Sequence, residues 1–160
     1  MLTNCLCVLA ICFSFLGQNL PGVTQDTKAV NIEHTTSFVV QPQDTNHNYP
    51  MLFGGKVLAE MDRCAGITTR RFLYHSPTGA KDAVTIAINS VKFLKGGEVK
   101  DLLFVSGKVI KVGEKSITVK VTVERETKKG KELLTEGEYV FVAYDLGLRK
   151  AVVHGLKLTE

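Results

Sequence analysis

The apolar residues of this sequence change their spacing near Pro77, and that change restricts the folds open to the chain. From residue 53 to about residue 73 they follow the 3.6-residue period of a helix. After the turn-forming stretch "HSPTGAKD", apolar and polar residues alternate with the two-residue period of strands. One long helix followed by a run of strands predicts an α+β domain in which the helix covers an antiparallel sheet.

The predicted helix is amphipathic, with charged and apolar side chains on opposite faces. The charged set is Lys56, Glu60, Arg63, Arg70 and Arg71. The apolar set is Val57, Leu58, Met61, Cys64, Ala65 and Phe72. A stripe between the faces combines small side chains with one carboxylate, and it consists of Ala59, Asp62, Gly66 and Thr69. Because small side chains allow close approach, we expect another backbone or a ligand at this stripe.

Segments rich in Val, Ile, Thr, Tyr and Phe predict strands at residues 83–94, 101–112, 115–126 and 136–145. A shorter strand is expected before the helix, at residues 37–40. Gly113 and Glu114 predict a tight connection between the second and third of the later strands. A looser connection at residues 128–130 leads into the last strand.

The first part of the chain stands apart from this pattern. Residues 5–16 form an apolar run of the length found in signal peptides, but no Lys or Arg precedes it and the first cation is Lys28. We interpret residues 1–28 as an apolar leader or N-terminal extension and residues 29–160 as a single domain. We expect a cytoplasmic protein, and the leader leaves export or membrane association open.

Charge and cysteine content exclude several classes of protein. The net charge of +4 favours an anionic ligand but is too small to indicate a nucleic-acid partner without a clustered patch. Cys5, Cys7 and Cys12 lie together in the leader, and only Cys64 lies in the body, so no disulfide framework is predicted. No His/Cys spacing typical of zinc is present, and we expect no metal.

Two features near the start of the helix have both a structural and a functional interpretation. Gly54 and Gly55 either allow a tight turn or expose N–H groups at a helix N-terminus, where a polarised carbonyl oxygen is stabilised. Asp62 is either an ordinary helix charge or a reactive carboxylate. The preceding loop adds four polar side chains at close range, those of Asp44, Asn46, His47 and Asn48. Serine-nucleophile, Walker and dinucleotide glycine motifs are absent from the sequence.

The stretch "QPQDTNHNYPMLFGGKVLAEMDRCAG", with "VTIAINSVKFLK" and "KVIKVGEKSITVKVTVERE" after it, resembles the hotdog-fold acyl-CoA thioesterases. The D-T-N, F-G-G and M-D motifs of that family occur here in the same order, and the resemblance covers residues 37–145. It implies a long central helix wrapped by an antiparallel sheet. It also implies an acyl-CoA substrate, with coenzyme A as part of substrate and product and no separate cofactor.

The resemblance also implies roles for individual residues. Asp62 matches the catalytic acid, as a general base on water or as a nucleophile that forms an anhydride. Asn46 matches the active-site asparagine that the facing subunit of a dimer contributes. The amides of Gly54 and Gly55 would polarise the thioester carbonyl. The family implies a homodimer that assembles into a tetramer or hexamer, with no stable membrane partner.

The sequence departs from the family pattern in two places. The segment "HNYPML" is one residue longer than usual, so Asn48 can take the role of Asn46. The later strand carries Asn89 where the family usually has Asp, and Gly96 follows where it usually has Pro. These changes concern substrate contacts more than the catalytic acid.

Coenzyme A carries phosphates, so cations are expected along its binding site. By resemblance, "KVGEKS" lies near the nucleotide, which nominates Lys115 and Ser116. Charge alone adds Lys92 and Lys95 with the helix residues Arg70 and Arg71. The remaining substrate contacts that we expect are Phe53, Asn89 and Phe93.

Two other functions remain open at this point. A hotdog hydratase or dehydratase would use His47 with Glu60 or Asp62. A non-catalytic acyl-CoA-binding module would keep the ligand groove without needing the acid. The combination of F-G-G with M-D is the thioesterase form of the motif, which favours hydrolysis over both.

Overall fold

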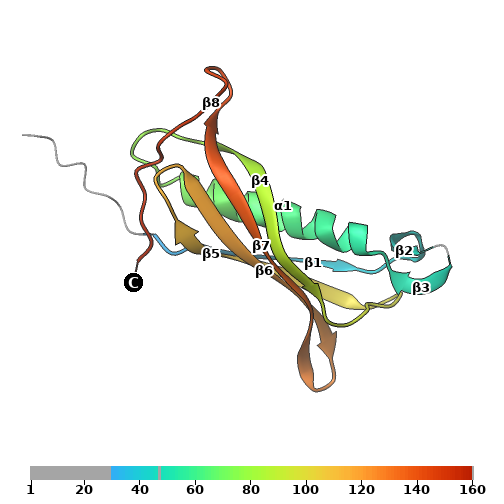
Figure 1. The fold of residues 1–160 in the computed structure, drawn as a ribbon. Coiled ribbons are helices and arrows are strands. Elements are labelled where there is room, and N and C mark those ends of the chain that lie inside the picture. The colour runs from blue at the N-terminus through green and yellow to red at the C-terminus, as the bar shows by residue number, and fades with distance from the viewer. Residues whose placement is uncertain (1–29, 47, 160) are drawn as a thin grey trace, which may run out of the picture.

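The computed structural model describes residues 30–46 and 48–159. The leader predicted at residues 1–28 and the hydratase candidate His47 lie outside the described residues. Within them, a single long helix lies across the concave side of a curled antiparallel sheet (Figure 1). The α+β architecture expected from the change of period is confirmed.

The helix α1 spans Gly54–Leu73, within one residue of the predicted start. Phe53 precedes it in an extended conformation, and the Phe53 carbonyl accepts the amides of Lys56 and Val57 at 3.0 and 3.2 Å. Arg70 and Arg71 lie in the last turn, where cations interact favourably with the helix dipole. The described part of the chain contains no helix with the length and apolar character that a bilayer span requires.

The sheet has the order β1-β5-β6-β7-β4, with β8 paired to β7. Its strands are β1 (Glu33–Val39), β4 (Asp82–Phe93), β5 (Leu102–Val112), β6 (Ser116–Thr127), β7 (Gly130–Asp145) and β8 (Lys150–Ala151). A 3-10 turn η1 (Pro42–Asp44) and a small hairpin of β2 (Thr45–Asn46) and β3 (Tyr49–Leu52) precede the helix. The later strands lie where the period-two segments predicted them, while β1 begins before residue 37 and β7 before residue 136.

The order of strands in the sheet differs from their order along the chain. β4 follows the helix but pairs with β7, antiparallel, with Val84 opposite Val142 and Ile88 opposite Tyr139. It therefore forms one edge of the sheet and β1 forms the other. Val84, Ile86 and Ile88 are exposed along this edge strand. Local periodicity predicts each strand but contains no information on which strand it pairs with.

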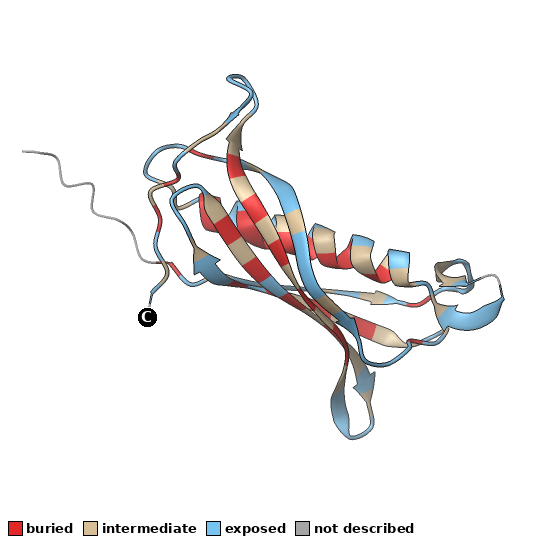
Figure 2. Ribbon diagram, viewed as in Figure 1, coloured by how far each residue is buried: buried red, intermediate tan, exposed pale blue. Residues whose placement is uncertain are grey.

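The core lies between one face of α1 and the concave face of the sheet (Figure 2). Met61, Cys64 and Phe72 of the helix are fully buried there, together with Val119 and Tyr139 of the sheet. Burying a side chain such as Met61 or Phe72 contributes about 1.5–3 kcal/mol to folding. The helix is thus held mainly by its apolar face.

The polar face of the helix differs from expectation at Glu60, which is 5% exposed. Its carboxylate pairs with Lys56, 2.9 Å away, and with Arg63. Leu58, expected on the buried face, is only partly buried. Periodicity assigns side chains to faces but does not reveal how far the surrounding elements cover each face, and two cations make the burial of Glu60 tolerable.

Candidate active site

Asp62 lies in the middle of α1 and is half-buried. Its Oδ1 atom accepts a hydrogen bond of 3.0 Å from the hydroxyl of Thr85 on the edge strand β4. No hydrogen bond or ion pair to its second oxygen, Oδ2, occurs within residues 30–46 and 48–159. The carboxylate is therefore oriented through one oxygen and remains available through the other.

Tyr139 of β7 places a second hydroxyl in this region. Its side chain is fully buried, and its Oη donates to the carbonyl of Leu58 at 3.4 Å, one helical turn before Asp62. Burial, and then the charge of Asp62, raise the pKa of Tyr139 to about 12. The phenol therefore stays protonated and neutral at physiological pH.

The start of α1 presents free backbone N–H groups. The Phe53 carbonyl accepts the amides of Lys56 and Val57, whereas the amides of Gly54 and Gly55 have no acceptor among the described residues. A side chain at residue 55 would collide with the ring of Phe53. These exposed amides and the positive end of the helix dipole together favour a partly negative oxygen at this position.

The β2–β3 hairpin is fastened to the same helix end through Asp44. The carbonyl of Asp44 accepts the Phe53 amide at 2.9 Å, and its Oδ1 lies 3.5 Å from Lys56 Nζ. Asn46 is exposed at the end of β2, and its Oδ1 accepts the amide of Asn48 at 3.4 Å. Asp44 is thus a structural acid, whereas Asn46 projects from a supported hairpin.

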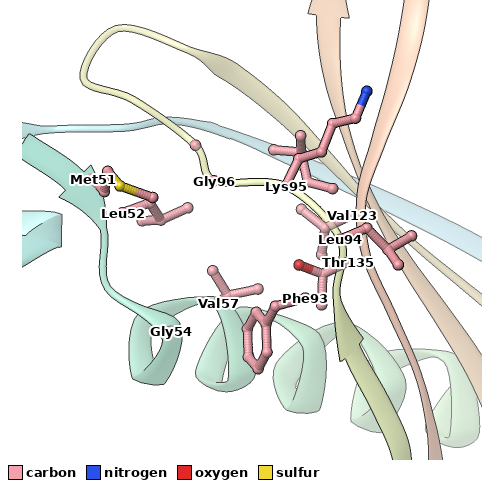
Figure 3. A pocket seen from close by; sticks show the side chains of 12 residues that line it. Met51, Leu52, Gly54, Val57, Phe93, Leu94, Lys95, Gly96, Val123 and Thr135 are labelled. Carbon is pink, nitrogen blue, oxygen red and sulfur yellow. The ribbon is translucent and has the colours of Figure 1, made fainter.

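Two cavities adjoin the start of the helix. One of about 240 Å³ is lined by Gln43, Asp44, Thr45, Asn46, Phe53 and Lys56. The other, of about 390 Å³, lies between the first turns of α1, β3 and the segment after β4, and Gly54 and Phe93 line it (Figure 3). The Phe93 ring passes 3.6 Å from where a side chain at Gly54 would begin. Among the described residues, no group of three or more His, Cys, Asp or Glu side chains could hold a metal ion.

Comparison with known proteins agrees with this geometry. The family model of the thioesterase superfamily matches residues 49–131, more than half of the chain. The chain belongs to the thioesterase superfamily. The match begins at β3 and includes the helix, the edge strand and the β5–β6 pair, so it covers Asp62 and Thr85.

Individual members of the superfamily support the assignment. An uncharacterized acyl-CoA thioester hydrolase of Haemophilus influenzae is 30% identical over 112 residues, which are 67% of this chain and 68% of that protein. The protein YkhA of Bacillus subtilis, another uncharacterized acyl-CoA thioester hydrolase, is 35% identical over 108 residues, 66% of this chain and 59% of that protein.

Solved structures confirm the hotdog fold. An acyl-CoA hydrolase of Staphylococcus aureus in complex with coenzyme A has a TM-score of 0.68 at 30% identity, covering 80% of this chain and 74% of that one. Structures of that enzyme include variants with one asparagine, one aspartate or one threonine replaced by alanine. A hexameric broad-specificity acyl-coenzyme A thioesterase has a TM-score of 0.63 at 27% identity, over 81% of this chain and 84% of its own.

The thioesterase fold brings some of the expected site residues together. Gly54, Gly55, Phe53 and Phe93 surround the start of the helix. Asp62 lies eight residues beyond Gly54, about 12 Å along the helix axis. Within the described chain no hydrogen bond links Asp62 to Asn46 or Asn48.

Other expected substrate contacts lie at the far end of the helix. Arg70 is about 24 Å from Gly54 along α1, and Arg71 donates to the Glu33 carbonyl at 3.3 Å. Lys115 and Ser116 follow Glu114, whose carbonyl accepts the amide of His154, and the His154 ring packs on Phe72 near the helix end. One subunit therefore does not bring these groups close to the glycines.

Two further candidates lie on β4, and Lys95, just beyond its end, pairs with Glu132 of β7. Asn89 is exposed opposite Glu138 of β7. Lys92 Nζ lies 3.9 Å from Glu136, so its charge is partly matched by a neighbouring strand. Both residues lie on the same edge strand as Thr85.

Sequence reasoning missed Thr85 and Tyr139. Thr85 lies within a period-two segment where threonine is an ordinary strand residue, and Tyr139 fits the apolar positions of β7. Their hydroxyls become informative only through partners on the helix. The one available signal was the small-residue stripe around Asp62, which predicted a close neighbour without naming it.

Proposed function

We propose that this protein hydrolyses acyl-CoA thioesters to a free acid and coenzyme A. The observation that carries the proposal is the Asp62 carboxylate, held by Thr85 at 3.0 Å on a helix whose first amides are free. The activities named for relatives in Haemophilus and Staphylococcus support the choice of substrate. Coenzyme A enters as part of the substrate and leaves as product.

In the proposed mechanism, the amides of Gly54 and Gly55 polarise the thioester carbonyl and stabilise the negative charge that develops on its oxygen. Because Asp62 lies about 12 Å from Gly54 along its own helix, we propose that the Asp62 acting on this carbonyl belongs to the facing subunit. It acts through Oδ2 as a general base on water, and direct attack to form an anhydride is the alternative. Thr85 orients the carboxylate through Oδ1. The coenzyme A thiolate leaves without a strong general acid, because thiols have a pKa of about 8.5.

We propose that the complete site requires two subunits. Asn46 projects from the hairpin and does not bond to Asp62 in its own chain, which supports its contribution to the site of a facing subunit. Asn48 is the alternative, because the loop is one residue longer than the family pattern. The hexameric state of the solved relatives supports assembly of such dimers into a tetramer or hexamer.

In that assembly, we propose that the phosphates of coenzyme A are bound by Lys115, Ser116, Arg70 and Arg71. The rest of the substrate is proposed to contact Lys92, Asn89, Phe53 and Phe93. The separation of these groups within one chain is compatible with an extended ligand that spans a subunit boundary.

We also propose that the catalytic domain occupies residues 29–160 and works in the cytoplasm, where acyl-CoA is formed. Mass spectrometry of the mature N-terminus tests whether residues 1–28 are retained.

The deciding experiment measures thiol release from acyl-CoA by the full chain and by Asp62→Asn. We expect Asp62→Asn to lower kcat by about 10²- to 10⁴-fold, while coenzyme A still binds. Asp82→Asn is the matched control, because Asp82 is an exposed acid at the start of β4, the edge strand that also carries Thr85. Acyl-CoA binding without turnover in the wild type would establish a binding module, and hydration of enoyl-CoA without thiol release would establish a hydratase.

A further inference from the structure

The 390 Å³ cavity beside Gly54 has a graded lining. Met51, Phe93 and Leu94 surround its mouth and are exposed, whereas Val57, Val123 and Leu134 form its floor and are each 5% exposed or less. Figure 3 shows Lys95 directed away from the space that these apolar side chains enclose. The cavity is therefore open to solvent at one end and closed by the core at the other.

Backbone contacts hold this cavity in shape. The Leu52 amide donates to the Gly97 carbonyl at 2.8 Å, and the amides of Leu94 and Lys95 donate to the Leu134 carbonyl at 2.8 and 3.1 Å. Met51 forms an isolated bridge with Glu98 and lies so close to Gly96 that a side chain there would meet its methyl group. The hairpin, the β4 extension and β7 are thus fastened around the space, and its size is a property of the fold.

The position of Gly54 connects this space to the proposed chemistry. Gly54 lines the cavity and also carries one of the free amides at the start of α1. A thioester carbonyl bound at that amide would therefore lie next to the cavity. Coenzyme A is too large and too polar for an apolar space at the small end of ligand-site volumes, which run from about 300 to 1,000 Å³.

We propose that this cavity binds the acyl chain of the substrate, as an unbranched fatty acyl group, and that its floor of Val57, Val123 and Leu134 sets the chain length that the enzyme prefers. The proposal rests on the acyl-CoA hydrolase function proposed above. Each methylene that enters the cavity is transferred from water into contact with apolar side chains. The selectivity kcat/KM therefore rises about fourfold per methylene until the chain reaches the floor.

The test measures kcat/KM for a series of straight-chain acyl-CoA substrates from acetyl to palmitoyl. Leu134→Ala deepens the floor, so the rise in kcat/KM continues to longer chains than in the wild type. Its matched control is Leu103→Ala, because Leu103 is equally buried in the core but does not line the cavity. The control loses comparable stability and keeps the wild-type preference.

A second pair of variants avoids the core, in case Leu134→Ala does not fold. Leu94→Ala removes an exposed part of the mouth, and Leu148→Ala removes an exposed leucine of the β7–β8 turn. We expect Leu94→Ala to lower kcat/KM for the preferred chain by about four- to tenfold. Leu148→Ala should leave the whole profile unchanged.

A wild-type profile that is independent of chain length, or the same profile in each variant and its control, would overturn the assignment of the cavity while leaving hydrolysis intact. Absence of thiol release from every acyl-CoA, acetyl-CoA included, would instead overturn the proposed function. The two failures are therefore distinguishable within one series of assays.

Discussion

The hydroxyl of Thr85 donates a 3.0 Å hydrogen bond to Oδ1 of Asp62, joining the edge strand β4 to the middle of the helix. The two residues are 23 positions apart in the chain, and one belongs to a strand while the other belongs to the helix. Because β4 has a partner strand on one side only, whatever covers its free edge can also affect the orientation of this carboxylate.

Replacing Thr85 by Val removes this hydrogen bond while keeping the shape of the side chain. Hydrogen bonds to charged groups contribute about 1.5–3 kcal/mol, so kcat/KM should fall about 10- to 100-fold. Thr85→Ser keeps the hydroxyl and should restore kcat/KM, and an unchanged kcat/KM in Thr85→Val would contradict the positioning role.

A site shared between subunits can be tested by mixing inactive variants. Asn46→Ala and Asp62→Asn should each be inactive alone, but a mixed dimer contains one site with both native residues. Equal mixing after denaturation and refolding should recover about a quarter of the wild-type activity. No recovery would place both residues in the site of one chain, and recovery with Asn48→Ala in place of Asn46→Ala would assign the role to Asn48.

Stability should fall in mild acid because of His154. Its ring is fully buried, Nδ1 accepts the Leu156 amide at 3.1 Å, and burial lowers the pKa of His154 below its ordinary value of 6.5. Above pH 6.5 the histidine is neutral in both states and its stabilising effect is complete. As the pH falls below 6.5, the unfolded chain binds a proton that the folded chain does not, and the free energy of unfolding decreases.

Urea denaturation at several pH values measures this effect. His154→Asn keeps an acceptor for the Leu156 amide but cannot titrate. It should lower stability at neutral pH and show a smaller loss between about pH 7 and pH 5.5. An equal pH dependence in the wild type and in His154→Asn would mean that other groups cause the acid sensitivity.

Cys64 should be unreactive in the folded protein. Its thiol is fully buried and donates to the Val105 carbonyl at 3.3 Å, and burial raises the pKa of Cys64 from 9.0 to about 11. The thiolate is the reactive form, so the shift alone lowers its labelling rate about 100-fold. Peptide mass spectrometry after alkylation, with and without urea, distinguishes Cys64 from Cys5, Cys7 and Cys12. Rapid native labelling of Cys64 would show that this part of the core opens.

Local features of the sequence were sufficient to predict the helix and the five longer strands. The segment expected as a loop before the helix instead forms the β2–β3 hairpin, and β8 was not predicted. The bounds of α1 follow from an apolar stripe that begins after Phe53 and ends before Pro77, because helix formation depends on residues three and four apart. The alternation in β5 and β6 is local in the same sense, and in the structure every second side chain is buried over much of each strand. The resemblance to thioesterases added Asp62 and the glycines, because their motifs are contiguous in the chain.

The sequence alone therefore determined the helix, the longer strands, the fold class and the identity of the candidate acid. Only the tertiary structure placed β4 against β7, brought Thr85 to Asp62, buried Glu60 between two cations and separated Asn46 from Asp62 within the chain. Secondary structure arises from interactions between residues close in sequence, whereas these contacts join residues whose proximity depends on how the whole sheet curls around the helix.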